Sequence, residues 1–350
     1  MERAEAYLRS LELFGMRFGL DRMRRLTTAL GRPQESFDSI HVVGSNGKSS
    51  TTRMIASLLD RHGLRTGTYT SPHLVSYRER VRVADHEVDE AAFADAVGRA
   101  ARAAELVDRT LGSGDHVTQF EVLTAAAYSE LARRGVEVAV VEAGLGGRYD
   151  ATNVIPSVVQ VLTTVSLEHT RWLGPTLTDI AREKLAVVQA GGTLVLGPGL
   201  HADAERVAEE VAAAQGARIV RVPEDEAGAP AVPGAAFQRR NFAVARAAAE
   251  AYLQAVRGPD ALLDEEAVRA AAATATSVPG RFQLVDGRPP TIFDGAHNPD
   301  GMQVLVESLA EYLGEGNPSD AGEAGASGEA GEAGTGPVVA VVSILDDKDA

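Results

Sequence analysis

Residues 41–52 read His-Val-Val-Gly-Ser-Asn-Gly-Lys-Ser-Ser-Thr-Thr, and no other stretch constrains the fold as strongly. The apolar residues at 40–43 predict a strand, and apolar residues at helical spacing beyond the turn predict a helix that stops near Gly63. A strand, a glycine turn and a helix form an anion site, because glycine lets backbone N–H groups approach a phosphate and the helix N-terminus adds partial positive charge. The segment therefore predicts phosphate binding, with a purely structural turn as the alternative.

The turn has the pattern Gly-x-x-Gly-Lys-Ser, which suggests roles for its side chains. Lys48 would reach the terminal phosphates of a nucleotide, while Ser49 or Ser50 would hold magnesium. The turn is not a standard Walker A sequence, because Val42 stands where GxxxxGK requires its first glycine. We expect ATP-binding contacts from Gly44, Asn46, Gly47, Lys48, Ser49 and Ser50.

Composition excludes several classes of protein. The 350 residues suffice for two domains with cores of their own. The chain has no cysteine, which excludes disulfides, thiolate zinc sites and cysteine nucleophiles and is typical of a cytoplasmic protein. With 34 basic and 49 acidic residues the net charge is −15, so nucleic acid is not an expected partner. No apolar stretch reaches the roughly 18 residues of a membrane span, so we expect no membrane partner.

Apolar runs alternate with helical or loop segments along most of the chain. The runs have the character of buried parallel strands, and their alternation predicts an open α/β sheet with its ligand site at the carboxyl ends of the strands. Residues 1–35 are predicted to be helical, and an alanine-rich helix is predicted at 239–257, after a loop-rich break at 222–236. The predicted buried strands are 136–141, 158–163 and 193–196.

A second, smaller α/β unit is predicted to start just before Pro279-Gly280. Two strands, near 282–285 and 291–294, open it. Residues 314–337 are rich in Gly, Ala, Glu and Ser without periodicity and are predicted to be disordered. An apolar strand at 338–345 follows, after which the unit is incomplete for a doubly wound sheet. We assign an ATP-binding P-loop domain to 1–278 and a partial C-terminal domain to 279–350.

Polar side chains follow several of the predicted strands. Glu142 comes at the end of one strand, where a P-loop enzyme places a magnesium or water ligand, although a solvated acid is the alternative. A glycine-rich turn follows it, and Asp150 is available there to hydrogen-bond a ligand. His169 follows another strand, beside the candidate magnesium ligands, which favours metal binding over the ordinary structural role of a lone histidine.

Other polar residues have weaker signals. Ser71 offers a hydroxyl at the end of a strand, and Arg78, Arg80 and Arg82 alternate after it, facing either an anionic substrate or the solvent side of a strand. Lys184 lies in a segment of helical character, where an exposed surface charge is the default interpretation. Three polar clusters suggest a second wall of one nucleotide cleft, and they lie at 238–241, 279–281 and 294–299.

The order of these motifs resembles one family. The segments GSNGKSS, TSPHL, TQFEVLTAAAY, VEAGLGGRYDATN, EH…LGPTLTDIAREK, QRRN, PGRF and DGAHNP are similar to those of the folylpolyglutamate synthase/dihydrofolate synthase family. That family is the folate branch of the Mur-type ATP-dependent ligases. The resemblance runs in order from about residue 10 to residue 350, and GLGGRYDATN and DGAHNP are specific to the folate branch.

The resemblance implies a P-loop-containing, Mur-ligase-like central domain with a mostly parallel sheet, over which a smaller Rossmann-like C-terminal domain closes. It implies that ATP phosphorylates a substrate carboxylate and that the amino group of L-glutamate then displaces the phosphate. A carboxylate does not react with amines until one oxygen can leave as phosphate, so the enzyme works by positioning and charge neutralisation. The implied acceptor is dihydropteroate or a reduced folate. We expect a cytoplasmic protein and a monomer.

The resemblance also implies roles for residues by their position in the motifs. Two magnesium ions would be held by Ser71, Glu142, His169 and a carbamate on Lys184. The pterin pocket would be lined by Thr118, Phe120, Asp150 and Ala151. The nucleotide would be contacted from the closing side by Asn241, Arg281 and Asp294. Catalytic roles fall to Lys48, Lys184 and His297, the last of which would lie near the reacting phosphate.

Three departures from the family pattern stand out. Ser49 takes the second glycine of Gly-Lys-Gly-Ser/Thr, which leaves open which serine meets the metal. Glu168 replaces the common aspartate before the metal histidine, and Leu185 begins a bulkier turn beyond the lysine. The alternatives are a Mur-type cell-wall amide ligase and a non-catalytic ATP-binding relative. The sequence does not decide between dihydropteroate, folate or both as acceptors.

Overall fold

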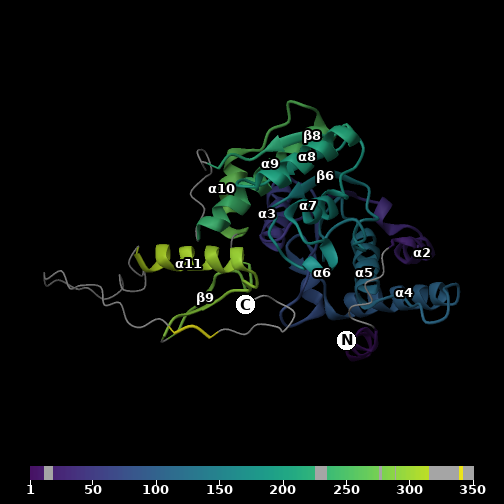
Figure 1. Cartoon of the computed structure of the whole chain (residues 1–350). Coiled ribbons are helices and arrows are strands. Elements are labelled where there is room, and N and C mark those ends of the chain that lie inside the picture. The colour runs from purple at the N-terminus through teal and green to yellow at the C-terminus, as the bar shows by residue number, and fades with distance from the viewer. Residues whose placement is uncertain (12–18, 225–234, 276–277, 288, 315–338, 342–350) are drawn as a thin grey trace, which may run out of the picture.

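A single large sheet organises most of the chain in the computed structural model, which describes residues 1–11, 19–224, 235–275, 278–287, 289–314 and 339–341 (Figure 1). Its strand order is β4-β3-β2-β5-β1-β6-β7-β8. The strands from β2 to β8 in this order run parallel, and only β3 and β4 at one edge are antiparallel. The predicted mostly parallel α/β sheet is thus confirmed. The strands are β1 (Asp38–Val43), β2 (Thr66–Tyr69), β3 (Val81–Val83), β4 (His86–Glu87), β5 (Val138–Glu142), β6 (Ser157–Leu162), β7 (Thr193–Leu196) and β8 (Arg218–Arg221).

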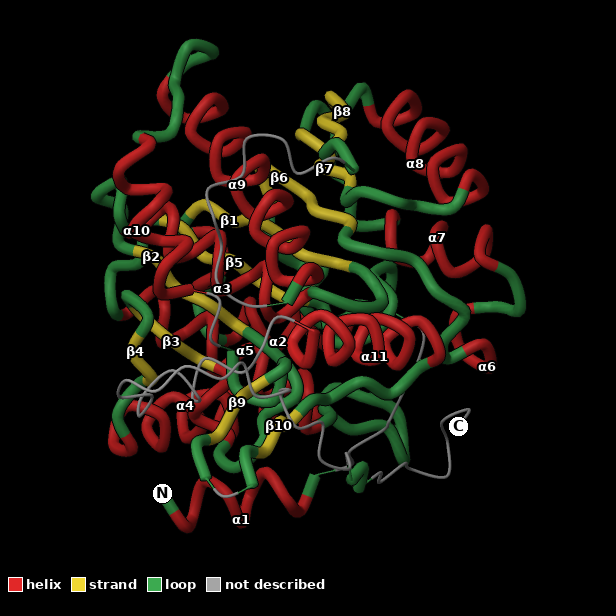
Figure 2. The backbone as a smooth tube through the Cα atoms, turned by 90° about the vertical axis from the view of Figure 1, so that its left-hand side faces the viewer, coloured by secondary structure: helices red, strands yellow, loops and turns green. Residues whose placement is uncertain are grey.

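Helices cover both faces of the sheet, as Figures 1 and 2 show. The central strands bury apolar side chains on both faces, as parallel strands do. Val140 of β5 belongs to the core under α3, α9 and α10, while its neighbour Val141 belongs to the core under α4 and α5. The helices are α1 (Glu2–Ser10), α2 (Asp21–Ala29), α3 (Lys48–Asp60), α4 (Glu90–Asp108), α5 (Gln119–Arg133), α6 (Thr170–Leu173), α7 (Leu177–Leu185), α8 (Ala202–Gln215), α9 (Ala236–Arg257) and α10 (Glu265–Ala275), with 3-10 turns η1 (Pro33–Glu35) and η2 (Tyr77–Arg80).

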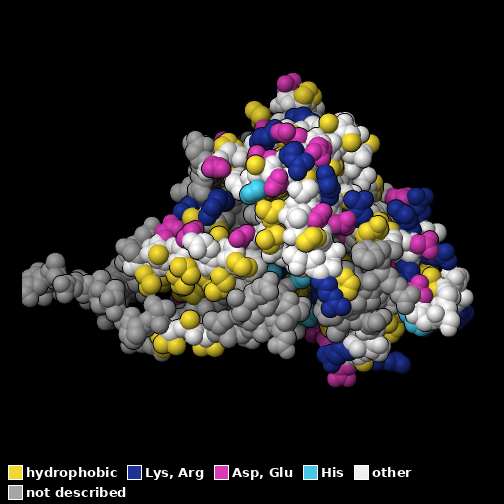
Figure 3. All heavy atoms as spheres, viewed as in Figure 1, with side chains coloured by type: hydrophobic (Ala, Val, Ile, Leu, Met, Phe, Trp, Pro, Cys, Tyr) yellow, Lys and Arg dark blue, Asp and Glu magenta, His cyan; other side chains and the backbone are white. Residues whose placement is uncertain are grey.

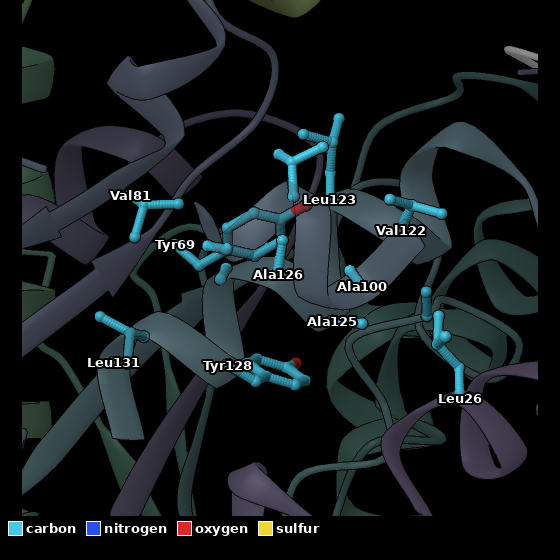
Figure 4. Packing of buried hydrophobic residues seen from close by; sticks show 14 of the residues in the cluster. Leu26, Tyr69, Val81, Ala100, Val122, Leu123, Ala125, Ala126, Tyr128 and Leu131 are labelled. Carbon is cyan, nitrogen blue, oxygen red and sulfur yellow. The ribbon is translucent and has the colours of Figure 1, made fainter. Parts of the chain in front are cut away.

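The core under α4 and α5 contains two buried tyrosines (Figure 4). The rings of Tyr69 and Tyr128 meet edge to face with centroids 6.4 Å apart. Both hydroxyls are hydrogen-bonded, as buried polar groups require: that of Tyr69 lies 3.1 Å from Thr124 Oγ1, and that of Tyr128 donates to the Thr152 carbonyl at 3.1 Å. This packing links α5 to β2 and to the segment that follows β5.

The C-terminal unit has a sheet of its own. Strands β9 (Gln283–Val285) and β10 (Thr291–Phe293) pair antiparallel and precede helix α11 (Pro299–Gly314). The two strands occur where the sequence predicts them. Glu311 Oε1 of α11 and Arg239 Nη2 of α9 form a partly exposed ion pair at 2.8 Å. Apolar side chains gather on the visible face of α11 in Figure 3, and Val306 is 57% exposed.

Several sequence-based expectations fall at the margin of the described chain. The predicted disordered segment 314–337 starts at the last residue of α11, and its remainder lies outside the described residues. Most of the predicted loop-rich break at 222–236 and of the terminal strand at 338–345 also lies outside them, while 339–341 are exposed and not part of a strand. No helix in the described ranges combines the length and apolarity needed to cross a bilayer.

Candidate active site

The phosphate loop connects β1 to α3 at the carboxyl edge of the sheet. Gly44 has φ 151° and Gly47 has φ 83°, values that favour glycine. Space is also restricted, because a Cβ on Gly44 would lie 1.9 Å from Thr163 Oγ1 and a Cβ on Gly47 would lie 2.5 Å from Asn241 Oδ1. The loop therefore lies between the end of β6 and the start of α9, and the structure brings Asn241 to it.

Two threonines after β6 hold the loop in place. The hydroxyl of Thr163 donates to the Asn46 carbonyl at 2.7 Å, and that of Thr164 accepts from the Asn46 amide at 2.9 Å. The Ser45 amide donates to the Thr164 carbonyl at 2.9 Å. Sequence reasoning missed these residues, although two hydroxyl side chains directly after a buried apolar strand were a signal for this edge of the sheet.

Two lysines converge on the loop. Lys48 Nζ donates to the carbonyls of Gly44 and Ser45 at 2.9 and 3.0 Å. Lys184, on α7, donates to the same Gly44 carbonyl at 2.9 Å and to Glu168 Oε1 at 2.8 Å. Its exposed fraction is 1%, so the default interpretation of an exposed helix lysine is wrong.

Burial and charge shift the pKa values of this pair. Burial lowers the pKa of Lys184 to about 8, and the ion pair with Glu168, which acts in the opposite direction, does not outweigh it. Burial alone would raise the pKa of Glu168, but the ammonium groups of Lys184 and Lys48 lower it to about 2. Glu168 is therefore ionised, and Lys184 has a neutral fraction near neutral pH.

Glu142 occupies the centre of the carboxyl edge and is 1% exposed. Its Oε1 accepts from Ser49 Oγ at 3.0 Å, and its Oε2 accepts from the Ser71 amide at 3.1 Å. Burial raises its pKa, while the positive charges of Lys48 and Arg281 act to lower it. A buried carboxylate with neutral hydrogen-bond donors beside a phosphate loop suits Mg²⁺, which binds through one or two carboxylates together with substrate phosphates.

The other residues expected to bind magnesium have less support from the structure than Glu142. Within the described ranges no three His, Asp or Glu side chains are grouped so as to hold a metal ion. His169 precedes α6 with φ 46°, and its carbonyl accepts from Trp172 and Leu173. An unmodified Lys184 is a cation and does not fit as a metal ligand. Ser49 approaches Glu142, whereas Ser50 is buried on α3.

The residues expected to line a pterin pocket gather around the start of α5. Thr118 caps α5 and exchanges hydrogen bonds with Glu121. The ring of Phe120 lies 6.2 Å from that of Tyr69, and a Cβ on Gly144 would lie 2.6 Å from Phe120 Cζ. Glycine therefore lets the turn after β5 lie directly on the phenylalanine ring.

Asp150 stabilises the turn after β5 by accepting hydrogen bonds. Its Oδ2 accepts from the Leu145 amide at 2.8 Å, and its Oδ1 accepts from the Thr152 amide at 3.0 Å and from the Thr152 hydroxyl. Burial raises the pKa of Asp150, which these hydrogen bonds oppose. Ala151 is buried next to it. Contact of these residues with a ligand stays a prediction.

The three arginines after Ser71 do not share one environment. Arg78 and Arg80 lie in η2, and only Arg82 lies in a strand, so the alternation on one strand is wrong. Arg78 and Arg82 form partly exposed ion pairs with acidic neighbours. Arg80 is only 8% exposed and donates from Nε to His73 Nδ1 at 3.0 Å, with no ion-pair partner in the part of the chain that the structure describes.

The closing side of the site is built by the segment 278–298. Asp294 holds it together, since its carboxylate accepts from the amides of Phe282 and Ala296, both at 2.7 Å. Arg281 is close enough to Glu142 to affect its pKa. His297 is exposed, and its Nδ1 lies 3.1 Å from the Gly295 carbonyl. The next residue, Asn298, contacts the phosphate loop.

Comparisons with known proteins give a consistent result. No family model matches the chain. The chain is 33% identical over 370 residues to a folylpolyglutamate synthase of Lacticaseibacillus casei, covering 98% of this chain and 79% of that protein. It is 33% identical over 350 residues to a dihydrofolate synthase/folylpolyglutamate synthase of Escherichia coli, covering 98% of this chain and 76% of that protein. A solved folylpolyglutamate synthase complex with AMPPCP and folate superposes with a TM-score of 0.81 at 34% identity, covering 89% of this chain and 80% of that one.

Proposed function

Because the chain belongs to the folylpolyglutamate synthase/dihydrofolate synthase family and is an ATP-dependent ligase, we propose that this site joins L-glutamate to the carboxylate of a pterin or folate acceptor. The observation that carries the proposal is the arrangement of a glycine phosphate loop, two converging lysines and a buried carboxylate at one edge of the sheet. In the first step the acceptor carboxylate attacks the γ-phosphorus of ATP, and ADP leaves with the electrons of the broken bond. In the second, the neutral amine of glutamate attacks the acyl carbon, phosphate leaves with the electrons of the broken C–O bond, and the nitrogen loses a proton to give the amide.

The chain's own residues would serve these steps by position and charge. The backbone of Gly44 to Lys48 and the Lys48 ammonium would hold the phosphates and offset the charge that develops on them. Arg281 and His297 would approach from the closing side. The buried guanidinium of Arg80 would bind a substrate carboxylate, since a buried cation without an ion-pair partner is stabilised by an anion.

The proposed metal site is centred on Glu142. Ser49 and Glu142 would hold one Mg²⁺ beside the nucleotide, where the ion would neutralise phosphate charge. A second Mg²⁺ with His169 requires that Lys184 carry a carbamate. That modification needs a neutral amine, which attacks CO₂ and releases a proton, and the lowered pKa of Lys184 favours it. The carbamate replaces a cation with oxygens, which Mg²⁺ prefers.

The remaining parts of the proposal concern the acceptor and the assembly. Phe120, packed on Gly144, would stack against the pterin ring, with Thr118, Asp150 and Ala151 around it. We place the boundary between the two domains near residue 278, because β9, β10 and α11 form a sheet and helix separate from the large sheet. The protein would act as a cytoplasmic monomer.

One assay tests the proposal directly. Purified protein is incubated with ATP, Mg²⁺ and labelled L-glutamate, with dihydropteroate, a tetrahydrofolate or a UDP-linked muramyl peptide precursor as the acceptor. Glutamate incorporated into either pterin acceptor, together with one ADP and one phosphate released per bond, supports the proposal and identifies the acceptor. Amide formation only with the muramyl compound, or glutamate-independent ATP hydrolysis alone, contradicts it.

A further inference from the structure

Asn46 of the phosphate loop and Asn298 of the C-terminal unit exchange two hydrogen bonds. Asn46 Nδ2 donates to Asn298 Oδ1 at 3.2 Å, and Asn298 Nδ2 donates to Asn46 Oδ1 at 3.1 Å. The two residues are 252 positions apart. A reciprocal pair of side-chain amides therefore links the nucleotide-binding loop of one unit to the other unit.

The orientation of both amides is fixed by a third hydrogen bond. The Gly301 amide donates to Asn298 Oδ1 at 2.8 Å, which places the oxygen of Asn298 and not its nitrogen on that side. Asn46 must then present its NH₂ group to this oxygen, and its own oxygen is left to accept from Asn298 Nδ2. Asn298 thus caps the first turn of α11 and contacts the loop with the same side chain.

The two ends of the pair are held differently. The main chain of Asn46 is fixed to the sheet edge by the hydroxyls of Thr163 and Thr164. Asn298 is buried and directly follows His297, which is exposed. A Cβ on Gly301 would lie 3.1 Å from Asn298 Oδ1 and 3.5 Å from Asn46 Oδ1, so glycine allows the loop to approach α11 closely.

We infer that Asn298 is a positioning residue that latches the segment 294–301 onto the phosphate loop and thereby sets His297 relative to the bound nucleotide. The catalytic part of this inference rests on the proposed ligase function, whereas the latch itself rests only on the contacts above. A latch of this kind acts on the rate of the reaction in the closed enzyme. The loop backbone and Lys48 can bind phosphates without it, because Asn298 contacts the loop only through the Asn46 side chain.

Three substitutions separate the latch from the helix cap. Asn298→Ser keeps an oxygen that can accept from Gly301 but is too short to reach Asn46. Asn298→Asp keeps both acceptor bonds and places a second oxygen against Asn46 Oδ1. Glu311→Gln removes the partly exposed ion pair between α11 and α9 and is the matched control, since such pairs contribute little.

Spin labels on two introduced cysteines measure the latch without any assay of activity. The chain has no cysteine of its own, so Glu266→Cys on α10 and Glu307→Cys on α11, both exposed, are labelled specifically. We expect one narrow distance distribution in the parent and in Glu311→Gln. In Asn298→Ser and Asn298→Asp we expect the distance distribution to broaden or shift. An unchanged melting temperature of Asn298→Ser would show that the cap of α11 is kept.

Kinetics then test the positioning role. In Asn298→Ser we expect kcat to fall on the order of 10- to 100-fold, as a displaced reacting group requires, while the Kd for AMPPCP stays within about twofold. A distance distribution in Asn298→Ser that matches the parent overturns the inference. A broadened distribution with an unchanged kcat overturns it as well. If the parent protein ligates no glutamate, the proposed function fails, and the label distances still decide whether the latch exists.

Discussion

Lys48 and Lys184 donate hydrogen bonds to one atom, the carbonyl oxygen of Gly44, each at 2.9 Å. Two ammonium groups on one oxygen repel each other, and Lys48 contributes to the lowered pKa of Lys184. Glu168 offsets only part of this charge. In the unmodified protein this positive charge attracts an anion to the phosphate loop. With a carbamate on Lys184, Lys48 is the lysine that stays positively charged next to the transferred phosphate.

Removing Lys48 should abolish most ligation without unfolding the protein. Loss of a preorganised positive charge from a transferring phosphate costs about 2.7–4 kcal/mol of transition-state stabilisation, or roughly 100- to 1,000-fold in kcat. We expect this loss in Lys48→Ala, measured as labelled glutamate incorporated per enzyme, with a circular dichroism spectrum like that of the parent. Near-normal turnover would remove Lys48 from the mechanism.

Lys184→Ala should be nearly inactive for a different reason, the loss of the proposed carbamate. We expect partial rescue by a short added carboxylate such as acetate. With ¹³C-bicarbonate, the parent and Lys48→Ala should give a carbamate carbon signal by NMR, and Lys184→Ala should not. An active Lys184→Ala enzyme, or a signal that persists in it, contradicts the carbamate.

The sequence was sufficient for the parts of the site that depend on local order. A strand, two glycines of positive φ and a helix are encoded next to one another, so Gly44, Gly47 and Lys48 could be placed without a structure. The alternation of apolar runs likewise predicted the parallel sheet, because buried strands need apolar residues on both faces.

The features of the site that the sequence did not predict depend on packing between segments that are far apart in the chain. Nothing in the spacing of Arg78, Arg80 and Arg82 shows that only the middle guanidinium is buried. Likewise, the pairing of Asn46 with Asn298 links residues 252 positions apart, and two asparagines in polar motifs carry no signal for each other. A functional role for Lys184 was indicated only by family resemblance, and its burial was not predicted, because an isolated lysine in a helical segment is ordinarily exposed.

Phe120 gives a test of the acceptor pocket. Its ring packs on Gly144 and near Tyr69, and stacking of a flat ligand ring is worth about 0.5–1.5 kcal/mol beyond burial. Phe120→Ala should raise the KM for the pterin acceptor far more than the KM for ATP. Steady-state kinetics with each substrate varied in turn provide the internal control, and equal changes in both KM values would assign Phe120 to the core instead.

Arg80 should select a carboxylate substrate. Because its guanidinium is buried and has no ion-pair partner among the described residues, its removal should raise the KM for glutamate or for the acceptor at least about tenfold, while the KM for ATP changes little. Arg80→Gln is the test variant, and Arg82→Gln, which loses partly exposed ion pairs and a hydrogen bond to the Asp85 carbonyl, is the matched control. Equal kinetics in the two variants would show that Arg80 has no role in binding.

His41 should make the free energy of unfolding depend on pH below neutrality. It lies fully buried in β1, with Nε2 2.8 Å from the Thr152 hydroxyl. That hydroxyl donates to the Asp150 carboxylate, so it accepts from His41 Nε2–H, while the buried Nδ1 has no hydrogen-bond partner among the described residues and would carry an unsatisfied proton if the ring were charged. Burial lowers the pKa of His41 to about 3, against about 6.5 in an unfolded chain.

The sign of the effect follows from proton binding. Between pH 6.5 and about 3 the unfolded chain protonates His41 and the folded chain does not, so the unfolded state binds more protons. The stabilisation is complete above pH 6.5 and falls by up to about 1.4 kcal/mol for each pH unit below it. Urea unfolding of the parent and of His41→Gln at several pH values should give a difference that shrinks with this slope. The exposed His86→Gln is the control, and a pH-independent difference for His41→Gln would show that the folded state accepts the charged imidazole.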